Sequence, residues 1–191
     1  MLEKDKRAKK VALVAHCLLN QNAKVNGFAF FPAMVGEIID LLRDHDYGIL
    51  QLPCPETIYA GTHRWWFVRE QYFTPGFINL ARNLLAPIID QIKEYQENGF
   101  KVILIGLDGS PSCGLRWSGS NPEWGGKPEI PASDYPVIEA KGAFMSTLVD
   151  MIKESNLEMP PMIGAGFDMP NFKVEDVAKE LDDFLTECDN R

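Results

Sequence analysis

The chain has 191 residues, of which 46% are hydrophobic, and it carries 27 acidic against 19 basic residues. This length and apolar content suit one globular domain with its own core, and nothing in the composition indicates disorder. The net charge of −8 argues against nucleic acid or an anionic membrane as the partner, so we expect a small-molecule partner.

Residues 1–10 are predicted to form a basic tail, and residues 11–191 a single domain. The tail carries five Lys or Arg residues ahead of the apolar run Val11–Ala15, as a secretory signal does. That run is too short for a signal peptide, and no later segment is long enough to span a bilayer. We therefore expect a soluble protein of the cytoplasm, with no membrane partner.

Short, uninterrupted apolar runs predict strands that are buried on both faces. They lie at Val11–Ala15, Gly48–Leu52, Phe100–Gly106 and around Met162–Gly164. Apolar residues at helical spacing predict helices between and after these runs. They lie at about Ala33–His45, from Pro75 to Asn98, at about Val137–Ser155 and at Val174–Cys188.

The segment Leu115–Pro136 has four prolines and no regular period, which predicts a long loop of the kind that covers a site. Strands that alternate with helices predict a parallel sheet, because each parallel connection needs a crossover. The predicted fold class is therefore α/β, with helices on both faces of the sheet, Rossmann-like or flavodoxin-like.

Cysteine accounts for four residues, and in a reducing compartment they are not expected to form disulfides. Cys17, Cys54 and Cys113 each follow a predicted strand by a few residues. Parallel sheets collect ligands beyond the carboxyl ends of their strands, so we expect these three cysteines at one site. Three thiolates suit zinc or an iron–sulfur cluster better than magnesium or calcium. Cys188 lies between acidic residues in the last helix, and we expect no role for it.

The segments around the three cysteines are AHCLLNQNAKVNG, PCPE and SPSCG. Together and in this order they resemble the 2-thiouracil desulfidase family, over roughly Val11–Gly114. The resemblance implies an oxygen-sensitive [4Fe–4S] cluster on Cys17, Cys54 and Cys113, with a fourth iron that accepts sulfur from a small thiolated heterocycle. After Glu56 the chain departs from the family pattern and reads TIYAGTHRWWFVREQYFTPGF, so the substrate itself is not implied.

Removal of sulfur by water needs a proton carrier, and Glu56 stands two residues from Cys54. Ser110 and Ser112 flank Pro111 beside Cys113, where their hydroxyls can bind substrate or a cluster sulfur. The alternatives are a solvated carboxylate and serines that only form a turn. Asp108 at the end of the third strand either holds a substrate N–H or caps that turn.

The densest aromatic cluster includes Trp65 and Trp66, on which a flat heterocycle can stack, although packing of the loop explains the cluster equally well. Three readings compete with the desulfidase. They are a zinc site on the same thiolates with His16 or water as fourth ligand, a metal-free thiol enzyme, and a non-catalytic α/β module that binds small molecules.

Overall fold

The computed structural model describes residues 5–125 and 136–190. Its centre is a parallel sheet of four strands in the order β2-β1-β3-β6. The strands are β1 (Lys10–Val14), β2 (Gly48–Gln51), β3 (Lys101–Leu107) and β6 (Met162–Ala165). All four confirm the predictions made from the apolar runs, and β1 and β3 are almost wholly buried because helices cover both faces.

Strand β1 lies between β2 and β3 and pairs with both in parallel. Val14, its last residue, is opposite Gln51 of β2 and Ile105 of β3. The three strands therefore reach the same edge of the sheet at nearly the same level. The segments that follow them all begin at this carboxyl edge, where parallel sheets hold their ligands.

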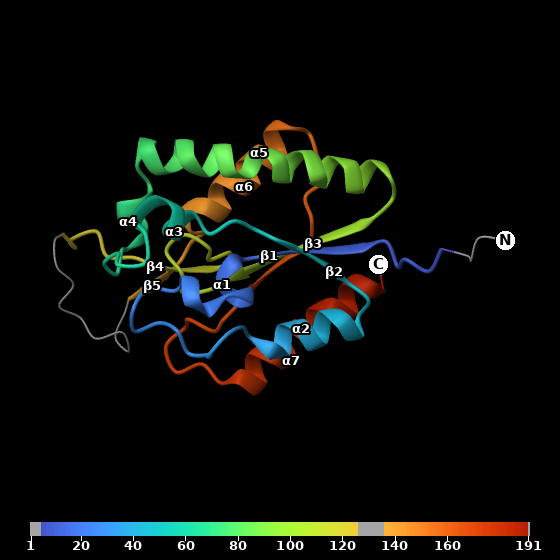
Figure 1. Ribbon diagram of the computed structural model, residues 1–191, viewed down its shortest axis with the longest axis horizontal. Coiled ribbons are helices and arrows are strands. Elements are labelled where there is room, and N and C mark those ends of the chain that lie inside the picture. The colour runs from blue at the N-terminus through green and yellow to red at the C-terminus, as the bar shows by residue number, and fades with distance from the viewer. Residues whose placement is uncertain (1–4, 126–135, 191) are drawn as a thin grey trace.

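Helices cover both faces of the sheet (Figure 1). On one face α5 (Pro75–Glu97) packs against α6 (Ala143–Glu154), and on the other α2 (Gly36–Asp44) packs against α7 (Val174–Asp189). This arrangement confirms the α/β fold class. Among the described residues, no helix has the length and apolar character needed to cross a membrane.

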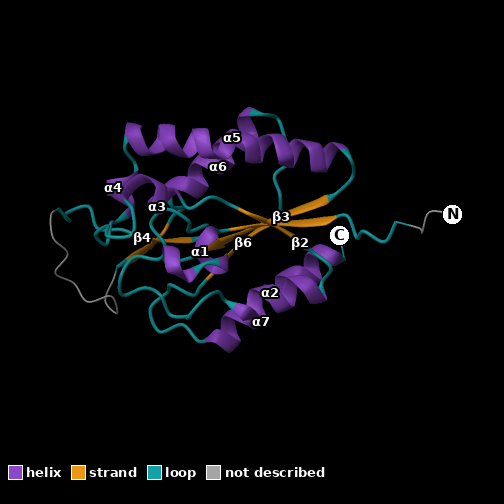
Figure 2. Cartoon of the chain, in the orientation of Figure 1, coloured by secondary structure: helices purple, strands orange, loops and turns teal. Residues whose placement is uncertain are grey.

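The shorter elements gather at the left of the sheet in Figure 2, whereas both chain ends lie at its right. They are α1 (His16–Leu19), the 3-10 helix η1 (Gln21–Ala23), α3 (Pro55–Ala60), α4 (Arg69–Tyr72), β4 (Trp117–Gly119) and β5 (Val137–Glu139). Several of them follow a strand directly, so they build the carboxyl edge of the molecule.

Helix α5 has the start and stop signals expected from its sequence. The Thr74 hydroxyl accepts a hydrogen bond from the Phe77 amide (3.3 Å), and Pro75 occupies the first turn. The helix ends before Gly99, whose φ of +72° is the left-handed conformation that glycine adopts at such ends. Its buried stripe is Phe77, Ala81, Leu85, Ile88, Ile89 and Ile92.

Two helices begin later than predicted. Helix α2 begins at Gly36 rather than Ala33, because Val35 is extended and its amide donates to the Leu18 carbonyl (2.9 Å). Helix α6 begins at Ala143 rather than Val137, because residues 137–139 form β5 instead.

Residues 115–136 were predicted to form one long loop, but part of this segment is a strand. Strand β4 pairs antiparallel with β5, and Ser118 lies opposite Ile138. Strands of three residues are too short to give a periodic signal in the sequence. Residues 126–135 of the predicted loop lie outside the described residues.

The predicted basic tail overlaps the fold at its last residue. Lys10 is the first residue of β1, and its ammonium group donates to Asp189 at the end of α7 (2.7 Å) and to the His45 carbonyl (3.1 Å). The domain therefore begins at Lys10 rather than at Val11. Residues 1–4 lie outside the described part of the chain.

His45 at the end of α2 joins this helix to α7. Its Nε2 lies 2.9 Å from Asp182 and its Nδ1 2.9 Å from Asp189. Burial disfavours the protonated ring, but the hydrogen bonds to the two carboxylates outweigh it and raise the pKa of His45. Its contribution to stability is therefore fully present below its ordinary pKa and is lost as the pH rises through the raised value.

We expect His45→Gln to lower the free energy of unfolding by about 1 kcal/mol at about pH 5.5 and by less at about pH 8.5. Urea denaturation at the two pH values measures the difference. His63→Gln changes an exposed histidine and serves as the control, with no loss expected at either pH. An equal loss for His45→Gln at both pH values would show that folding does not raise the pKa of His45.

Candidate functional site at the carboxyl edge

Three cysteines lie at the carboxyl edge of the sheet, each shortly after a strand. Cys17 belongs to α1 after β1, Cys54 precedes α3 after β2, and Cys113 lies in the turn after β3. All three are buried, with exposed fractions of 8%, 5% and 5%. The structure thus brings together the three cysteines that the sequence placed at neighbouring strand ends.

The cysteines influence one another electrostatically. The Cys17 thiol and the amide of Thr57, which donates to the Cys54 sulfur (3.4 Å), favour the Cys54 thiolate and lower its pKa to about 6. Interaction with Cys54 and burial raise the pKa of Cys17, while burial and the Glu56 carboxylate raise that of Cys113. Of the three thiols, that of Cys54 is therefore the one whose thiolate form the surroundings favour.

The turn that carries Cys113 is fixed by serine hydroxyls and by tight packing. The Cys113 amide donates to Ser110 Oγ (3.1 Å), and Ser112 Oγ lies 3.3 Å from the Cys113 sulfur. Gly109 opens the turn with a φ of +96°, and the backbone of Asp168 packs where a side chain would stand. A residue other than glycine would both strain this turn and displace Asp168.

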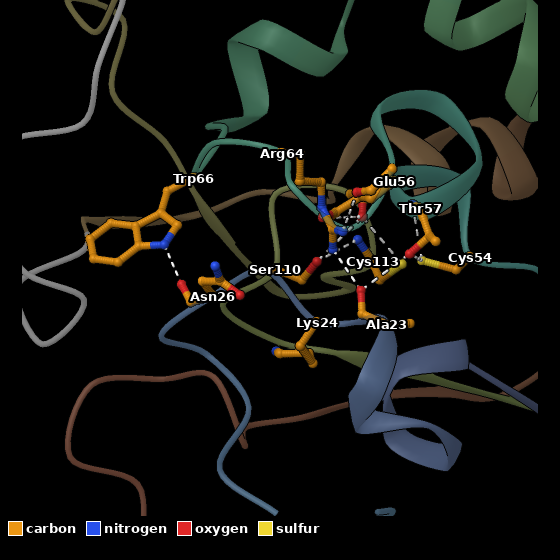
Figure 3. Close-up of polar contacts among 12 residues, drawn as sticks. Ala23, Lys24, Asn26, Cys54, Glu56, Thr57, Arg64, Trp66, Ser110 and Cys113 are labelled. Atoms are coloured by element: carbon orange, nitrogen blue, oxygen red, sulfur yellow. Dashed lines mark hydrogen bonds and ion pairs between the residues drawn. The ribbon is translucent and has the colours of Figure 1, made fainter.

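Glu56 joins this turn to the segment after β2. One carboxylate oxygen accepts from Ser112 Oγ (2.5 Å), and the other accepts from Arg64 Nε (3.0 Å). The Arg64 side chain is only 1% exposed and also donates to the carbonyls of Gly61 (2.9 Å) and Ala23 (2.8 Å). Figure 3 shows Arg64 and Glu56 together above Cys113, with Ala23 below. A buried carboxylate, held by hydrogen bonds to both of its oxygens, thus lies beside the cysteines.

A second buried ion pair lies beside the cysteines. Lys24, which follows η1, pairs with Asp168, which follows β6, and their side chains are 5% and 7% exposed. Burial raises the pKa of Asp168, although the Lys24 ammonium opposes this rise. The same ammonium opposes the rise in the pKa of Cys17 and Cys113, so it lies within electrostatic reach of both sulfurs.

The two ion pairs and Cys17 line one cavity. The space between its lining atoms, counted out to the open solvent at its mouth, is about 420 Å³. Its lining consists of Cys17, Lys24, Val25, Phe28, Glu56, Arg64, Trp66, Phe67, Leu107, Gly109, Ser110, Pro111 and Asp168.

The chain is similar in sequence to a protein of an archaeon. The uncharacterized protein MJ0003 of Methanocaldococcus jannaschii is 40% identical over 109 residues, which cover 57% of this chain and 70% of that protein. The chain belongs to the family of MJ0003. No protein-family model matches the chain, and no solved structure matches it. The name of this relative assigns no activity, so function rests on the site itself.

The other predicted site residues lie in different surroundings. Ser110 and Glu56 line the cavity, and Ser112 is buried directly behind Glu56. Asp108 does not line it, because one of its oxygens accepts from the amides of Leu115 and Arg116 (both 2.9 Å). With these two hydrogen bonds Asp108 caps the turn after β3, which is the second of the two roles expected for it.

The two tryptophans differ from one another. Trp66 lines the cavity, packs edge-on against Phe28 at 5.5 Å between ring centroids, and donates to the Asn26 carbonyl. Trp65 is 56% exposed and lines a more open pocket beside His63. A ligand in the cavity can therefore meet Trp66 but not Trp65.

Sequence reasoning missed three charged residues of the site. Lys24 stands within the segment that carried the family resemblance, and Arg64 within the aromatic cluster, but nothing marked either as part of the site. Asp168 follows β6 at the same edge of the sheet, and this position was the only feature of the sequence that could have indicated a place in the site. A sequence contains many oppositely charged residues, and only the folded structure shows which of them form ion pairs.

The described residues contain no group of three His, Cys, Asp or Glu side chains placed to hold a single metal ion. His16 lies 3.3 Å from the Asn20 side chain, and burial lowers its pKa. His16 therefore has the Asn20 side chain as a partner in this structure.

Proposed function

We propose that the protein is an iron–sulfur-dependent desulfidase that removes sulfur from a small thiolated heterocycle by hydrolysis. The proposal extends the resemblance to the 2-thiouracil desulfidase family. Its main support is that Cys17, Cys54 and Cys113, far apart in the sequence, are buried together beside a cavity that also holds Glu56. A reducing cytoplasm, where thiols stay free, suits such a site.

The donor set suits a [4Fe–4S] cluster in kind and number. Cys17, Cys54 and Cys113 would hold it, since thiolates are the ligands that iron–sulfur clusters take. A cluster distributes its ligands over several iron atoms, so its thiolates stand farther apart than those around a single ion. The Lys24 ammonium would offset part of the negative charge of the three thiolates.

When bound there, a cluster with three protein ligands supplies an iron with an open position that acts as a Lewis acid toward the substrate sulfur. The overall reaction is that a thiocarbonyl and water give a carbonyl and hydrogen sulfide. Glu56 is placed to accept the proton that the attacking water loses, because Arg64 balances its negative charge in the buried site.

The two serines orient the groups around Glu56. Ser112 donates its hydroxyl proton to Glu56 at 2.5 Å, which fixes the carboxylate, and its oxygen lies 3.4 Å from Ser110 Oγ. Ser110 lines the cavity, so its hydroxyl can bind a substrate atom there. Aromatic side chains form part of the cavity wall and reduce the space left for water around a bound ring.

Sulfide release tests the proposal. The chain is reconstituted with iron and sulfide without oxygen and mixed with a panel of thioamide heterocycles, and free sulfide and the carbonyl product are measured. We expect both to appear in equal amounts from at least one compound, with protein lacking iron as the control. A loaded protein that releases sulfide from no compound would contradict the proposal.

A further inference from the structure

The two ion pairs in the cavity differ in how many of their hydrogen-bonding groups are used. Arg64 donates to Glu56 and to two backbone carbonyls, and Glu56 accepts from Arg64 and Ser112 through separate oxygens. This pair is held on all sides. These contacts engage all three Arg64 nitrogens and both Glu56 oxygens, so the pair keeps a fixed position in the site.

Lys24 and Asp168 have unused capacity. The Lys24 ammonium donates to one oxygen of Asp168, and among the described residues neither group makes another hydrogen bond. Lys24 therefore keeps further N–H donors, and Asp168 keeps its second oxygen as an acceptor. Both side chains are more than nine-tenths buried and both line the cavity.

The position of this pair is fixed by the elements around it. The Asp168 backbone packs against Gly109 in the turn that leads to Cys113, and the Lys24 ammonium lies 5.9 Å from the centre of the Phe28 ring. Phe28, Trp66 and Phe67 supply apolar wall to the same cavity. A flat ring against this wall would present its edge to Lys24 and Asp168.

We propose that Lys24 and Asp168 determine specificity by binding the edge of a ring in which a carbonyl oxygen stands beside an N–H, as in a lactam, ureide or imide. The carbonyl accepts from Lys24 and the N–H donates to Asp168. The inference rests on the proposed function, because it assumes that the thiolated ring occupies this cavity. It assigns to the pair the edge of the substrate that does not carry sulfur.

Binding of sulfur-free rings to the full-length chain tests this assignment without any turnover. The probes are uracil, which has N–H beside carbonyl, 1,3-dimethyluracil, which lacks N–H, and pyrimidine, which lacks both. Titration followed by NMR measures the dissociation constants. We expect uracil to bind at least about tenfold more tightly than the other two, because one charge-assisted hydrogen bond contributes about that much.

Lys24→Met and Asp168→Asn are each expected to weaken uracil binding about tenfold or more and to leave the weak binding of pyrimidine, which has neither group, unchanged. Arg82→Met, which breaks an exposed ion pair with Glu154, is the matched control and is expected to bind like the wild type. If a single variant fails to fold, Lys24→Met/Asp168→Asn leaves no unpaired charge and carries the test. Thermal unfolding identifies the folded variants.

Three results would overturn the inference: folded variants that bind uracil as the wild type does, a wild type that does not distinguish the three rings, or no binding of any ring. The desulfidase itself is judged separately by sulfide release. If the protein distinguishes the three rings but releases no sulfide, only the desulfidase proposal is contradicted. If it releases sulfide but does not distinguish the rings, only the role of Lys24 and Asp168 is contradicted.

Discussion

Replacing Cys17, Cys54 or Cys113 by serine is expected to remove the brown iron–sulfur chromophore of the anaerobically reconstituted protein, whereas Cys188→Ser is expected to retain it. Each of the three contributes one thiolate of the proposed cluster. Partners that only orient a metal ligand change metal affinity 10–100-fold, so loss of a ligand itself is expected to exceed about 100-fold. Visible absorption, iron content and acid-labile sulfide measure the effect.

Cys188 is a close match as a control. It is as buried as Cys54 and Cys113, at 5% exposed, but it lies in α7, and its carbonyl accepts from Lys101 at the amino end of β3. A general cost of placing serine in the core would therefore affect all four variants. Only the cluster proposal predicts that Cys188→Ser keeps the chromophore while the other three variants lose it.

Other outcomes would identify the competing readings. A colourless wild type that holds zinc but no iron would favour the zinc site over the cluster. Loss of activity at a single cysteine, with no iron in any variant, would favour a thiol nucleophile. Normal folding and function of all three variants would leave a binding module whose cysteines only fill space.

Glu56→Gln is expected to reduce the rate of sulfide release by about 10²–10⁴-fold while the cluster stays bound. Glutamine keeps the shape of the side chain and can still accept from Ser112, but it cannot take a proton from water. Steady-state sulfide release by the loaded protein measures the loss, and visible absorption reports the cluster in the same sample.

The ion pair with Arg64 has to be separated from this chemical role. Loss of one partner of a buried pair costs about 3–5 kcal/mol of stability, so thermal unfolding of Glu56→Gln must be measured alongside. Glu56→Asp keeps the charge and is expected to recover part of the rate. A folded, cluster-loaded Glu56→Gln protein that releases sulfide at the wild-type rate would exclude Glu56 as the proton acceptor.

The sheet and its long helices were predictable because their signals are local and repeated. Strand β3 is an unbroken apolar run, and α5 has Thr74 and Pro75 at its start and Gly99 after its end. Helices α3 and α4 and strands β4 and β5 were not predicted. One turn of helix or three residues of strand carry no period, and packing at the carboxyl edge decides whether they form.

The proximity of the three cysteines was also predictable, because parallel strands place their carboxyl ends along one edge of the sheet. The partners of the charged residues were not. Lys24 and Asp168 are 144 positions apart and join two loops, and no sequence period links such pairs. Likewise, substrate binding and turn capping were equal alternatives for Asp108 until the amides of Leu115 and Arg116 placed it in the turn.

Strand β1 is made first by the ribosome but occupies the middle of the sheet, between two strands that are made later. Cys17 therefore comes close to both Cys54 and Cys113 only after β3 has been synthesised and has paired with β1. Contacts between distant parts of a chain form slowly, because the intervening segment must first be ordered. The complete set of three cysteines is thus formed only once the central strands of the sheet have docked.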